Sequence, residues 1–437
     1  MFADRHTLAD SSAHELALDC LAAGLEASMP ARAVERHVTL EDDSLRIDDS
    51  VYDLSTYDDV LVLGGGKGAD DLAAALETCL GTRLTGGVVV TNDRIATPER
   101  VDVRLGEHPT PGTGSVSGAT EVLDRARESD TETLVLAAIT GGASALLCAP
   151  AEGVSVDEVR AVTDGLLSAG ASIDELNTVR RACSMIKGGG LATAAAPATV
   201  VGLLVSDVVG DDPAVIGSGP TVPTTRDFDA ASTVLDRYTV DAPGVRAWLR
   251  AASPPDSDID DVVVDNHVIA SGRDAVDAAR TVATERGFEP CVLSTRIEGE
   301  ARDAGRFHAA VAAEMLDSAD PVAPPAVLLS GGETTVTVRG DGTGGPNLEL
   351  ALAAALELPE ATVCAAIDTD GEDGGTDAAG AIVDANTVCD TEAALDALDA
   401  NDSYRFFDAR GTLLRTGSTG TNVNDLRVVV VGAQSVD

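Results

Sequence analysis

The chain has 437 residues, 44% of them apolar, and a formal net charge of −43 at pH 7. This length exceeds the size at which one hydrophobic core usually divides, so we expect two domains. The apolar fraction excludes an acidic disordered protein, and the lack of a basic patch argues against binding to nucleic acid or to an anionic membrane surface. An acidic, lysine-poor chain is typical of halophilic proteins, whose self-repulsion is screened by salt.

The cysteines and the N-terminal residues indicate the cellular compartment of the protein. The seven cysteines are widely spaced without a Cys-x-x-Cys pair, which indicates buried thiols in a reducing compartment. The six histidines show no zinc-ligand spacing. Neither a signal peptide nor an uncharged apolar run long enough to span a membrane is recognisable. We therefore expect a cytoplasmic protein.

In chain order, a helix is predicted over residues 9–33, and the stretch that dominates the sequence follows at residues 58–77. It begins with a run of Val and Leu, which predicts a strand, and continues with three glycines, which predict a tight turn. The apolar residues that follow recur at helical spacing, so a helix is predicted after the turn. The helix N-terminus presents unpaired N–H groups and a positive dipole end to the glycine turn, which suits an anion. Lys67 adds a full charge there. Only two lysines occur, Lys67 and Lys187, and both adjoin glycine runs, so we predict an anion site at each.

Two more buried strands are predicted, over residues 85–93 and 133–140, separated by a loop at residues 106–115. The second strand stops at Gly141, Gly142 and the hydroxyl of Ser144. The alternation of buried strands with helices predicts a doubly wound, mainly parallel, Rossmann-like sheet, in which ligands bind at the carboxyl ends of the strands.

The middle of the chain carries polar residues at helical spacing. On a helix over residues 174–187, Asn177, Arg180 and Lys187 share one face. A strand over residues 200–205 then leads into Asp207, and the turn Gly217-Ser218-Gly219 follows.

Composition shifts toward Asp, Ser and Pro between residues 225 and 265, for example at Ser253-Pro254-Pro255-Asp256. We therefore predict an N-terminal domain over residues 1–245 and a smaller α/β domain over residues 260–437. In the second domain, predicted strands lead into Gly332 and Glu333 and into Asp370, and a glycine- and asparagine-rich loop precedes the last strand.

Two chemistries fit the first glycine turn. It matches a loose Gly-x-Gly-x-x-Ala pattern, so an NAD-dependent 2-hydroxyacid dehydrogenase is one alternative, although Lys67 crowds the pyrophosphate path. Leu61 and Gly68 break the Walker A pattern. Phosphoryl transfer needs phosphate-cradling N–H groups, a cation and carboxylates for magnesium, and the loops offer all three. A non-catalytic acidic binding protein is a third alternative, which would need neither lysine.

The motifs also resemble a known family, the glycerate kinases with a C-terminal MOFRL domain, or glycerate 2-kinases, and the acidic composition resembles a haloarchaeal member. The resemblance spans nearly the whole chain and rests on ten motifs. They are Gly65-Gly66-Lys67, His108-Pro109-Thr110-Pro111, Gly141-Gly142-Ala143-Ser144-Ala145-Leu146-Leu147, Asn177-Thr178-Val179-Arg180, Ile186-Lys187-Gly188-Gly189, Ser206-Asp207-Val208-Val209-Gly210-Asp211, Gly217-Ser218-Gly219-Pro220-Thr221, Ser330-Gly331-Gly332-Glu333-Thr334, Asp370-Gly371 and Thr419-Gly420-Thr421-Asn422-Val423-Asn424-Asp425.

The resemblance implies ATP- and magnesium-dependent phosphorylation of D-glycerate to 2-phosphoglycerate in a cleft between the two domains. Lys67 matches the active-site lysine of the family. Expected contacts to phosphate or substrate are Gly65, Gly66, Gly141, Gly142, Ser144, Asn177, Arg180, Lys187, Ser218, Gly219, Gly332, Asn347, Asn422 and Asn424. Expected metal ligands are Asp207, Glu333 and Asp370.

The sequence departs from the family at three positions. Gly112 stands where an acidic residue often follows the Pro-x-Pro motif, Ala143 replaces a glycine, and the third departure removes an arginine. The motif Gly-Gly-Arg-Asn-Gln-Glu reads Gly344-Gly345-Pro346-Asn347-Leu348-Glu349 here, so an expected anion contact is missing. Some relatives carry a hydroxypyruvate reductase label, which keeps the dehydrogenase alternative open. The sequence leaves the oligomeric state open, with a homodimer as one option.

Overall fold

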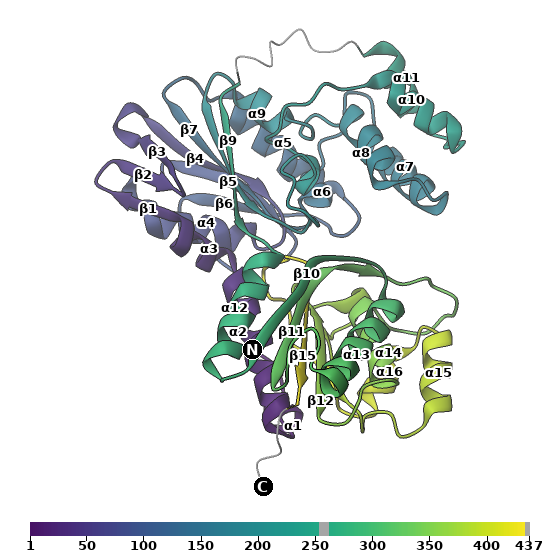
Figure 1. The fold of residues 1–437 in the computed structure, drawn as a ribbon. Coiled ribbons are helices and arrows are strands. Elements are labelled where there is room, and N and C mark those ends of the chain that lie inside the picture. The colour runs from purple at the N-terminus through teal and green to yellow at the C-terminus, as the bar shows by residue number, and fades with distance from the viewer. Residues whose placement is uncertain (253–261, 433–437) are drawn as a thin grey trace. The chain divides into compact units, whose positions relative to one another are not determined.

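A computed structural model of the chain describes residues 1–252 and 262–432 (Figure 1). The chain divides into two compact units. We call Pro30–Ile269 the continuous unit, and Met1–Met29 together with Ala270–Asp437 the discontinuous unit. The predicted division assigned residues 1–29 to the N-terminal domain, whereas here they belong with the C-terminal part of the chain. The predicted boundary motif Ser253–Asp256 lies outside the described residues.

The continuous unit is built on a six-stranded sheet with the strand order β6-β5-β4-β7-β8-β9. Strand β4 pairs in parallel with both β5 and β7, and the pairs β5–β6 and β7–β8 are also parallel. This confirms the predicted parallel α/β fold. The strands are β4 (Asp59–Gly65), β5 (Gly86–Thr91), β6 (Val101–Leu105), β7 (Thr133–Ile139), β8 (Thr199–Val205) and β9 (Val264–Ala270).

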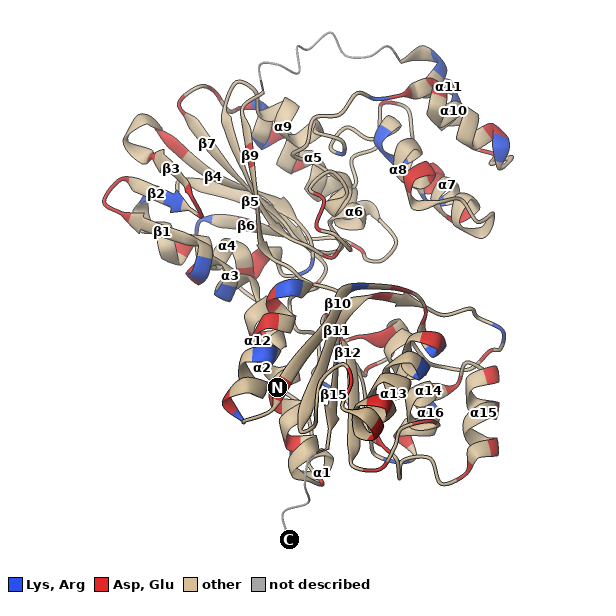
Figure 2. Cartoon of the chain, in the orientation of Figure 1, with Lys and Arg blue, Asp and Glu red and all other residues tan. Residues whose placement is uncertain are grey.

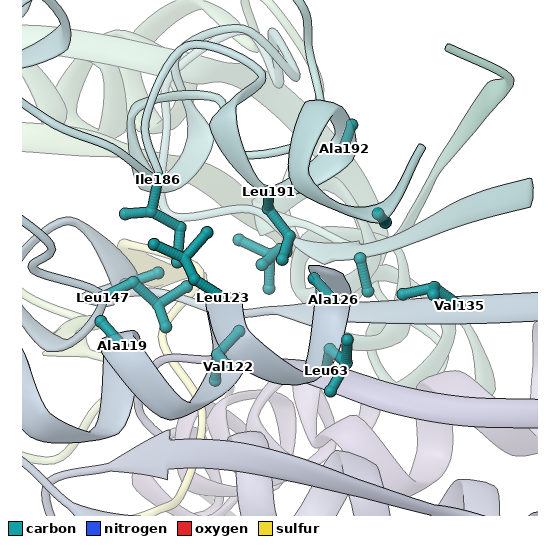
Figure 3. Close-up of a cluster of buried hydrophobic side chains, with 14 of the residues drawn as sticks. Leu63, Ala119, Val122, Leu123, Ala126, Val135, Leu147, Ile186, Leu191 and Ala192 are labelled. Carbon is teal, nitrogen blue, oxygen red and sulfur yellow. The ribbon is translucent and has the colours of Figure 1, made fainter. Parts of the chain in front are cut away.

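Helices cover both faces of this sheet. One face packs on α5 and α9 through an apolar cluster that includes Leu63, Val135, Leu123 and Leu191 (Figure 3). Helix α4 packs on β4, β5 and β7, and because side chains alternate along a strand, the intervening residues are available to it. The helices of the unit are α3 (Pro30–His37), α4 (Ala69–Leu80), α5 (Thr113–Arg127), α6 (Ala143–Leu146), α7 (Val156–Ser168), α8 (Ile173–Ala182), α9 (Gly190–Ala195), α10 (Phe228–Arg237) and α11 (Pro243–Ala251).

Two smaller substructures complete the continuous unit. Helices α7, α8, α10 and α11 share a separate apolar core, with Leu166, Val179 and Leu235 fully buried; we call them the four-helix layer. Strands β1 (Val38–Glu41), β2 (Ser44–Ile47) and β3 (Ser50–Asp53) form an antiparallel sheet.

The predicted helix over residues 174–187 is shorter than expected. Helix α8 ends at Ala182, because the next residues pair with a distant segment: the Met185 N–H donates to Ala149 O at 2.7 Å, and the Ala151 N–H donates to Cys183 O at 2.9 Å. Lys187 therefore lies in a loop, so the prediction of one helical face shared with Asn177 and Arg180 was wrong.

The discontinuous unit contains a mixed six-stranded sheet with the order β10-β11-β15-β12-β13-β14. Strands β10 and β11 are parallel, and β11–β15, β15–β12, β12–β13 and β13–β14 are antiparallel. The strands are β10 (Glu289–Glu300), β11 (Ala326–Thr335), β12 (Thr362–Asp368), β13 (Gly380–Asp384), β14 (Leu413–Leu414) and β15 (Asp425–Val431). The helices are α1 (Arg5–Leu8), α2 (Ser12–Ser28), α12 (Gly272–Glu285), α13 (Ala301–Ser318), α14 (Pro346–Ala355), α15 (Thr391–Asp399) and α16 (Ser403–Asp408).

Helix α2 explains why residues 1–29 belong to this unit. It packs on α12, β12 and β15, and the approach is close at Gly24, where an added Cβ would lie 2.3 Å from Leu426 Cδ2 and 3.0 Å from Ala275 O. No side chain larger than hydrogen fits there without a shift of these neighbours.

Acidic side chains are spread over the helices and loops of both units (Figure 2). In the described ranges, 1–252 and 262–432, none of the helices combines the length and the apolar character that a membrane crossing requires.

Candidate active site

The predicted glycine turns after β4 and β7 are joined to each other by hydrogen bonds. The Lys67 N–H donates to Gly141 O at 2.7 Å, and the Thr140 hydroxyl donates to Lys67 O at 2.7 Å. The contact explains Gly66, whose φ is +139° and where an added Cβ would lie 2.1 Å from the Thr140 hydroxyl oxygen. Gly65 precedes it at the end of β4, so the two turns hold the Lys67 backbone at the carboxyl edge of the sheet.

The Lys67 side chain, which is half-buried, lies beside Gly142. A Cβ added to Gly142 would lie 3.4 Å from Lys67 Cγ and 3.0 Å from the ring of His108. The Gly142 N–H donates to Asp207 Oδ2 at 2.9 Å, which brings the end of β8 to the same place. Burial raises the pKa of the Asp207 carboxyl, while the Gly142 N–H and the Lys67 charge act in the opposite direction.

A second group of predicted residues meets around Lys187. Its ammonium donates to Ser144 O at 2.6 Å and lies 3.3 Å from Ser144 Oγ, and the hydroxyls of Ser144 and Ser218 are 2.9 Å apart. Backbone bonds from Gly188 to Ser218 O and from Gly189 to Gly219 O join the two glycine turns. Lys187 is only 4% exposed, and burial lowers its pKa to about 8.

These two groups border one cavity of about 160 Å³. Gly142, Ser144 and Lys187 line it together with Arg180 of α8. Asn177 is buried on the same helix but does not line the cavity. The structure therefore brings eleven of the predicted residues to this edge of the sheet. They are Gly65, Gly66, Lys67, Gly141, Gly142, Ser144, Arg180, Lys187, Asp207, Ser218 and Gly219.

The remaining predicted residues lie in the discontinuous unit, where Asn347 occupies the buried start of α14. Its side-chain Nδ2 donates to Asp425 Oδ1 at 2.7 Å, and its backbone N–H donates to Asp373 Oδ1 at 3.0 Å. The buried guanidinium of Arg427 forms an ion pair with Asp425. Burial is the main cause that raises the pKa of Asp373 to about 7.

Three predicted positions in this unit are explained by backbone packing. Gly332 has a φ of +121°, and a Cβ there would lie 2.2 Å from Ile297 O in the neighbouring strand. Asn422 Oδ1 accepts a hydrogen bond from the Asn424 N–H at 3.0 Å, and Asn424 O accepts one from the Thr369 hydroxyl at 2.7 Å.

The predicted metal ligands are divided between the two units. Asp207 lies in the continuous unit, whereas Glu333 is exposed on β11 and Asp370 follows β12. Asp370 is 9% exposed, and its Oδ1 accepts a hydrogen bond from the Glu372 N–H at 2.9 Å. Among the described residues, no three His, Cys, Asp or Glu side chains are arranged to hold a metal ion.

Pro346, at the position where the family has arginine, is the first residue of α14. Proline is favoured at this position because its fixed φ suits a helix start and the missing N–H needs no partner there. Arg415, an arginine of the same unit, donates hydrogen bonds to Asp377, Asp408 and Tyr404.

Sequence reasoning did not select several residues of these sites. His108, Arg160 and Asp164 line the cavity, and Asp373 and Asp425 surround Asn347. His108 could have been found, because it stands in a motif already singled out, His108-Pro109-Thr110-Pro111. Asp425 could also have been found, because it ends the motif that begins at Thr419. Nothing in the local sequence distinguishes the other three from the many charged residues of the chain.

A parallel sheet with a lysine, an aspartate and glycine turns at its carboxyl edge is the arrangement of an α/β enzyme that acts on small anionic ligands. Comparisons with known proteins identify the family. The family model described as "Domain of unknown function (DUF4147)" matches residues 16–250, and that described as "MOFRL family" matches residues 326–425.

Related proteins extend over most of the chain. The D-glycerate 2-kinase of Thermotoga maritima is 38% identical and covers 96% of this chain and 99% of its own length. A protein of Agrobacterium vitis, provisionally named hydroxypyruvate reductase, is 40% identical and covers 85% of this chain and 99% of its own length. The crystal structure of glycerate kinase from Thermotoga maritima aligns with a TM-score of 0.82 at 36% identity, covering 96% of this chain and 99% of that one. The chain belongs to the MOFRL-domain glycerate kinase family.

Proposed function

We propose that this protein is a glycerate 2-kinase, which transfers a phosphoryl group from ATP to D-glycerate and forms 2-phosphoglycerate. The observation that carries the proposal is the contact between the turns after β4, β7 and β8, which places Lys67 beside Gly142 and Asp207. Relatives named glycerate 2-kinase match the chain over nearly its full length, so the same arrangement is expected to serve the same reaction.

Lys67 is the proposed catalytic residue. Phosphoryl transfer depends on positioning and on neutralising the charge of the transferred group. A compact ammonium on a flexible stem can follow that charge within a space bounded by glycines, which a planar guanidinium would fill. The Gly66–Lys67 and Gly141–Gly142 turns hold the backbone of the site in place through the bonds described above.

Magnesium is proposed to accompany the nucleotide. Mg²⁺ in kinases is commonly held by one or two carboxylates together with substrate phosphates and water. Asp207 is the predicted ligand that lies beside Lys67, and Asp370 is a partly accessible carboxylate of the other unit. When bound, the ion would neutralise phosphate charge, while the protein orients the acceptor.

The deciding experiment incubates the purified protein with ATP, MgCl₂ and D-glycerate and resolves 2- from 3-phosphoglycerate by ³¹P NMR. We expect 2-phosphoglycerate in the parent and almost none with Lys67→Ala. The relative named as a hydroxypyruvate reductase defines the competing outcome. Oxidation of NADH by hydroxypyruvate, without ATP-dependent product, would replace the kinase proposal with the dehydrogenase.

The net charge of the protein supports a proposal about the cellular compartment and salt concentration in which it works. A net charge of −43 suits a cytoplasm with a high salt concentration. Whether the protein forms a homodimer is a question for light scattering on the purified chain.

A further inference from the structure

The cavity beside the glycine turns lies between the sheet of the continuous unit and the four-helix layer. Residues 108–111 and 142–150 form one part of its wall, and α7, α8 and residues 183–187 form the other. Its volume is about 160 Å³. Sites for drug-sized ligands measure about 300 Å³ or more, so this cavity suits a smaller molecule.

The charges of the cavity are unbalanced. Arg160, Arg180 and Lys187 line it, whereas Asp164 is the one carboxylate in its described lining. Arg160 is engaged, because its Nε donates to Pro111 O at 2.5 Å and its Nη1 to Asp157 at 2.9 Å.

Lys187 and Arg180 remain available to a ligand in different ways. Two contacts of the Lys187 ammonium go to Ser144, which leaves one of its three protons for another acceptor. Within the described part of the chain, no residue accepts a hydrogen bond from the Arg180 guanidinium. Burial lowers the pKa of Arg180, because the charged guanidinium has lost hydrating water. An anion bound in the cavity would compensate for this lost hydration by accepting hydrogen bonds from the guanidinium.

The same cavity offers partners for hydroxyl groups. The Asp164 carboxylate accepts hydrogen bonds, the Thr163 hydroxyl can donate or accept, and the ring of His108 does either according to its tautomer. A small molecule with one anionic end and neighbouring hydroxyls would therefore satisfy the whole lining.

We propose that this cavity binds the three-carbon acceptor acid, that Arg180 and Lys187 hold its carboxylate, and that these two residues select D-glycerate over uncharged three-carbon polyols. The inference rests on the proposed function for the identity of the acid. It assigns the cavity to the acceptor and places the nucleotide outside it.

The first test measures the kinetics of Arg180→Gln and Lys187→Met. Loss of a charged hydrogen bond to the carboxylate should raise KM for D-glycerate about 10- to 100-fold, while KM for ATP stays within about twofold. The preference for D-glycerate over glycerol should fall by a similar factor. Arg237→Gln is the matched control: it removes an exposed arginine of the four-helix layer that does not line the cavity, and its KM values should equal those of the parent.

A second measurement uses the unmodified protein and so does not depend on whether the variants fold. A crystal structure of the protein with D-glycerate alone should show the carboxylate of the acid against Arg180 and Lys187. A crystal structure with ATP alone should show no nucleotide in this cavity.

The outcomes separate this inference from the proposed function. If the variants raise KM for ATP and leave KM for D-glycerate unchanged, the cavity holds phosphates and the assignment is overturned; unchanged values for both substrates overturn it as well. If the parent forms no phosphoglycerate although D-glycerate occupies the cavity in the crystal, the kinase proposal fails while the carboxylate site stands.

Discussion

Lys67 and Lys187, the only two lysines of the chain, occupy different surroundings. Lys67 is half-buried at a turn that precedes α4, whereas Lys187 is 4% exposed and held against Ser144. All other basic side chains that carry a fixed charge are arginines, so lysine occurs only at these two turns. This supports different tasks for the two: charge neutralisation at Lys67 and substrate binding at Lys187.

Replacement of Lys67 should separate activity from stability. Lys67→Ala should lower turnover about a hundredfold to a thousandfold, the cost of losing one preorganised charged group. A cation near a helix start mildly opposes the dipole, so stability should change by only about a few tenths of a kcal/mol. Turnover and melting temperature measured on the same preparations decide the matter. Lys67→Arg should restore little, because a planar fork does not fit the same space. An alanine variant within tenfold of the parent would remove Lys67 from the mechanism.

The pKa of Lys187 predicts how substrate binding depends on pH. The groups that influence it are Arg180, Cys148 and Cys183, and both thiols stay protonated near neutral pH because burial raises their pKa values. Lys187 loses its charge as the pH rises through about 8. KM for D-glycerate should therefore be lowest below pH 8 and rise by up to about tenfold per pH unit above it.

A KM titration from pH 6.5 to 9.5 on the parent and on Lys187→Met checks this. The variant should lack the alkaline rise, and its KM should be high throughout. If KM for D-glycerate rises equally steeply above pH 8 in Lys187→Met, a group other than Lys187 causes the pH dependence.

Among the elements, the turn after β4 requires a glycine at position 66. Gly66→Ala combines a φ of +139° with a Cβ only 2.1 Å from the Thr140 hydroxyl oxygen. We expect a loss of about 2 to 4 kcal/mol of unfolding free energy, because the turn after β7 would have to move. Gly153→Ala is the control: its φ is +77° but nothing lies within 4 Å of the added Cβ, so its cost should be about 1 kcal/mol. Urea denaturation of both variants measures the difference, and equal losses would show that backbone conformation alone matters.

The sequence pattern predicted a helix or strand correctly where interactions between residues close in the sequence determine it. The strand, glycine turn and helix around Lys67 follow from apolar runs and glycines, and the structure has β4 and α4 there. The end of α8 could not be predicted, because it depends on pairing between residues 149–151 and 183–185. Asp373 was missed for the same reason, because its role comes from burial beside Asn347. Asp425 stands in a motif already singled out, but its hydrogen bond with Asn347 joins segments far apart in the sequence and could not be predicted from that motif.

For the whole molecule, charge predicts a strong dependence on salt. The 73 acidic and 30 basic side chains leave a net charge of −43, and both units carry acidic surfaces. The Debye length falls from about 10 Å at 0.1 M salt to about 3 Å at 1 M, so repulsion between these charges weakens steeply. The melting temperature should rise by at least about 5 °C between 0.1 M and 2 M KCl, which corresponds to one or two kcal/mol. An unchanged melting temperature would contradict the halophilic interpretation.

The composition of the second unit could not be predicted from motifs. A boundary zone was expected between residues 225 and 265, but nothing in the apolar spacing of α2 says which sheet it covers. Its place beside α12 and β15 depends on a close approach at Gly24, a contact between segments far apart in the sequence.

That placement of α2 sets an order of events during synthesis. The 240 residues of Pro30–Ile269 are made between α2 and the rest of its unit, which takes about 12 to 48 s at about 5 to 20 residues per second. The continuous unit can fold during that interval. The apolar face of α2 has no packing partner in the same interval, because α12, β12 and β15 have not yet been translated. Nascent chains stalled just before α12 should therefore lose α2 rapidly to a protease and retain the parallel sheet. The buried face of this 17-residue helix therefore remains exposed until the final strands have been synthesised.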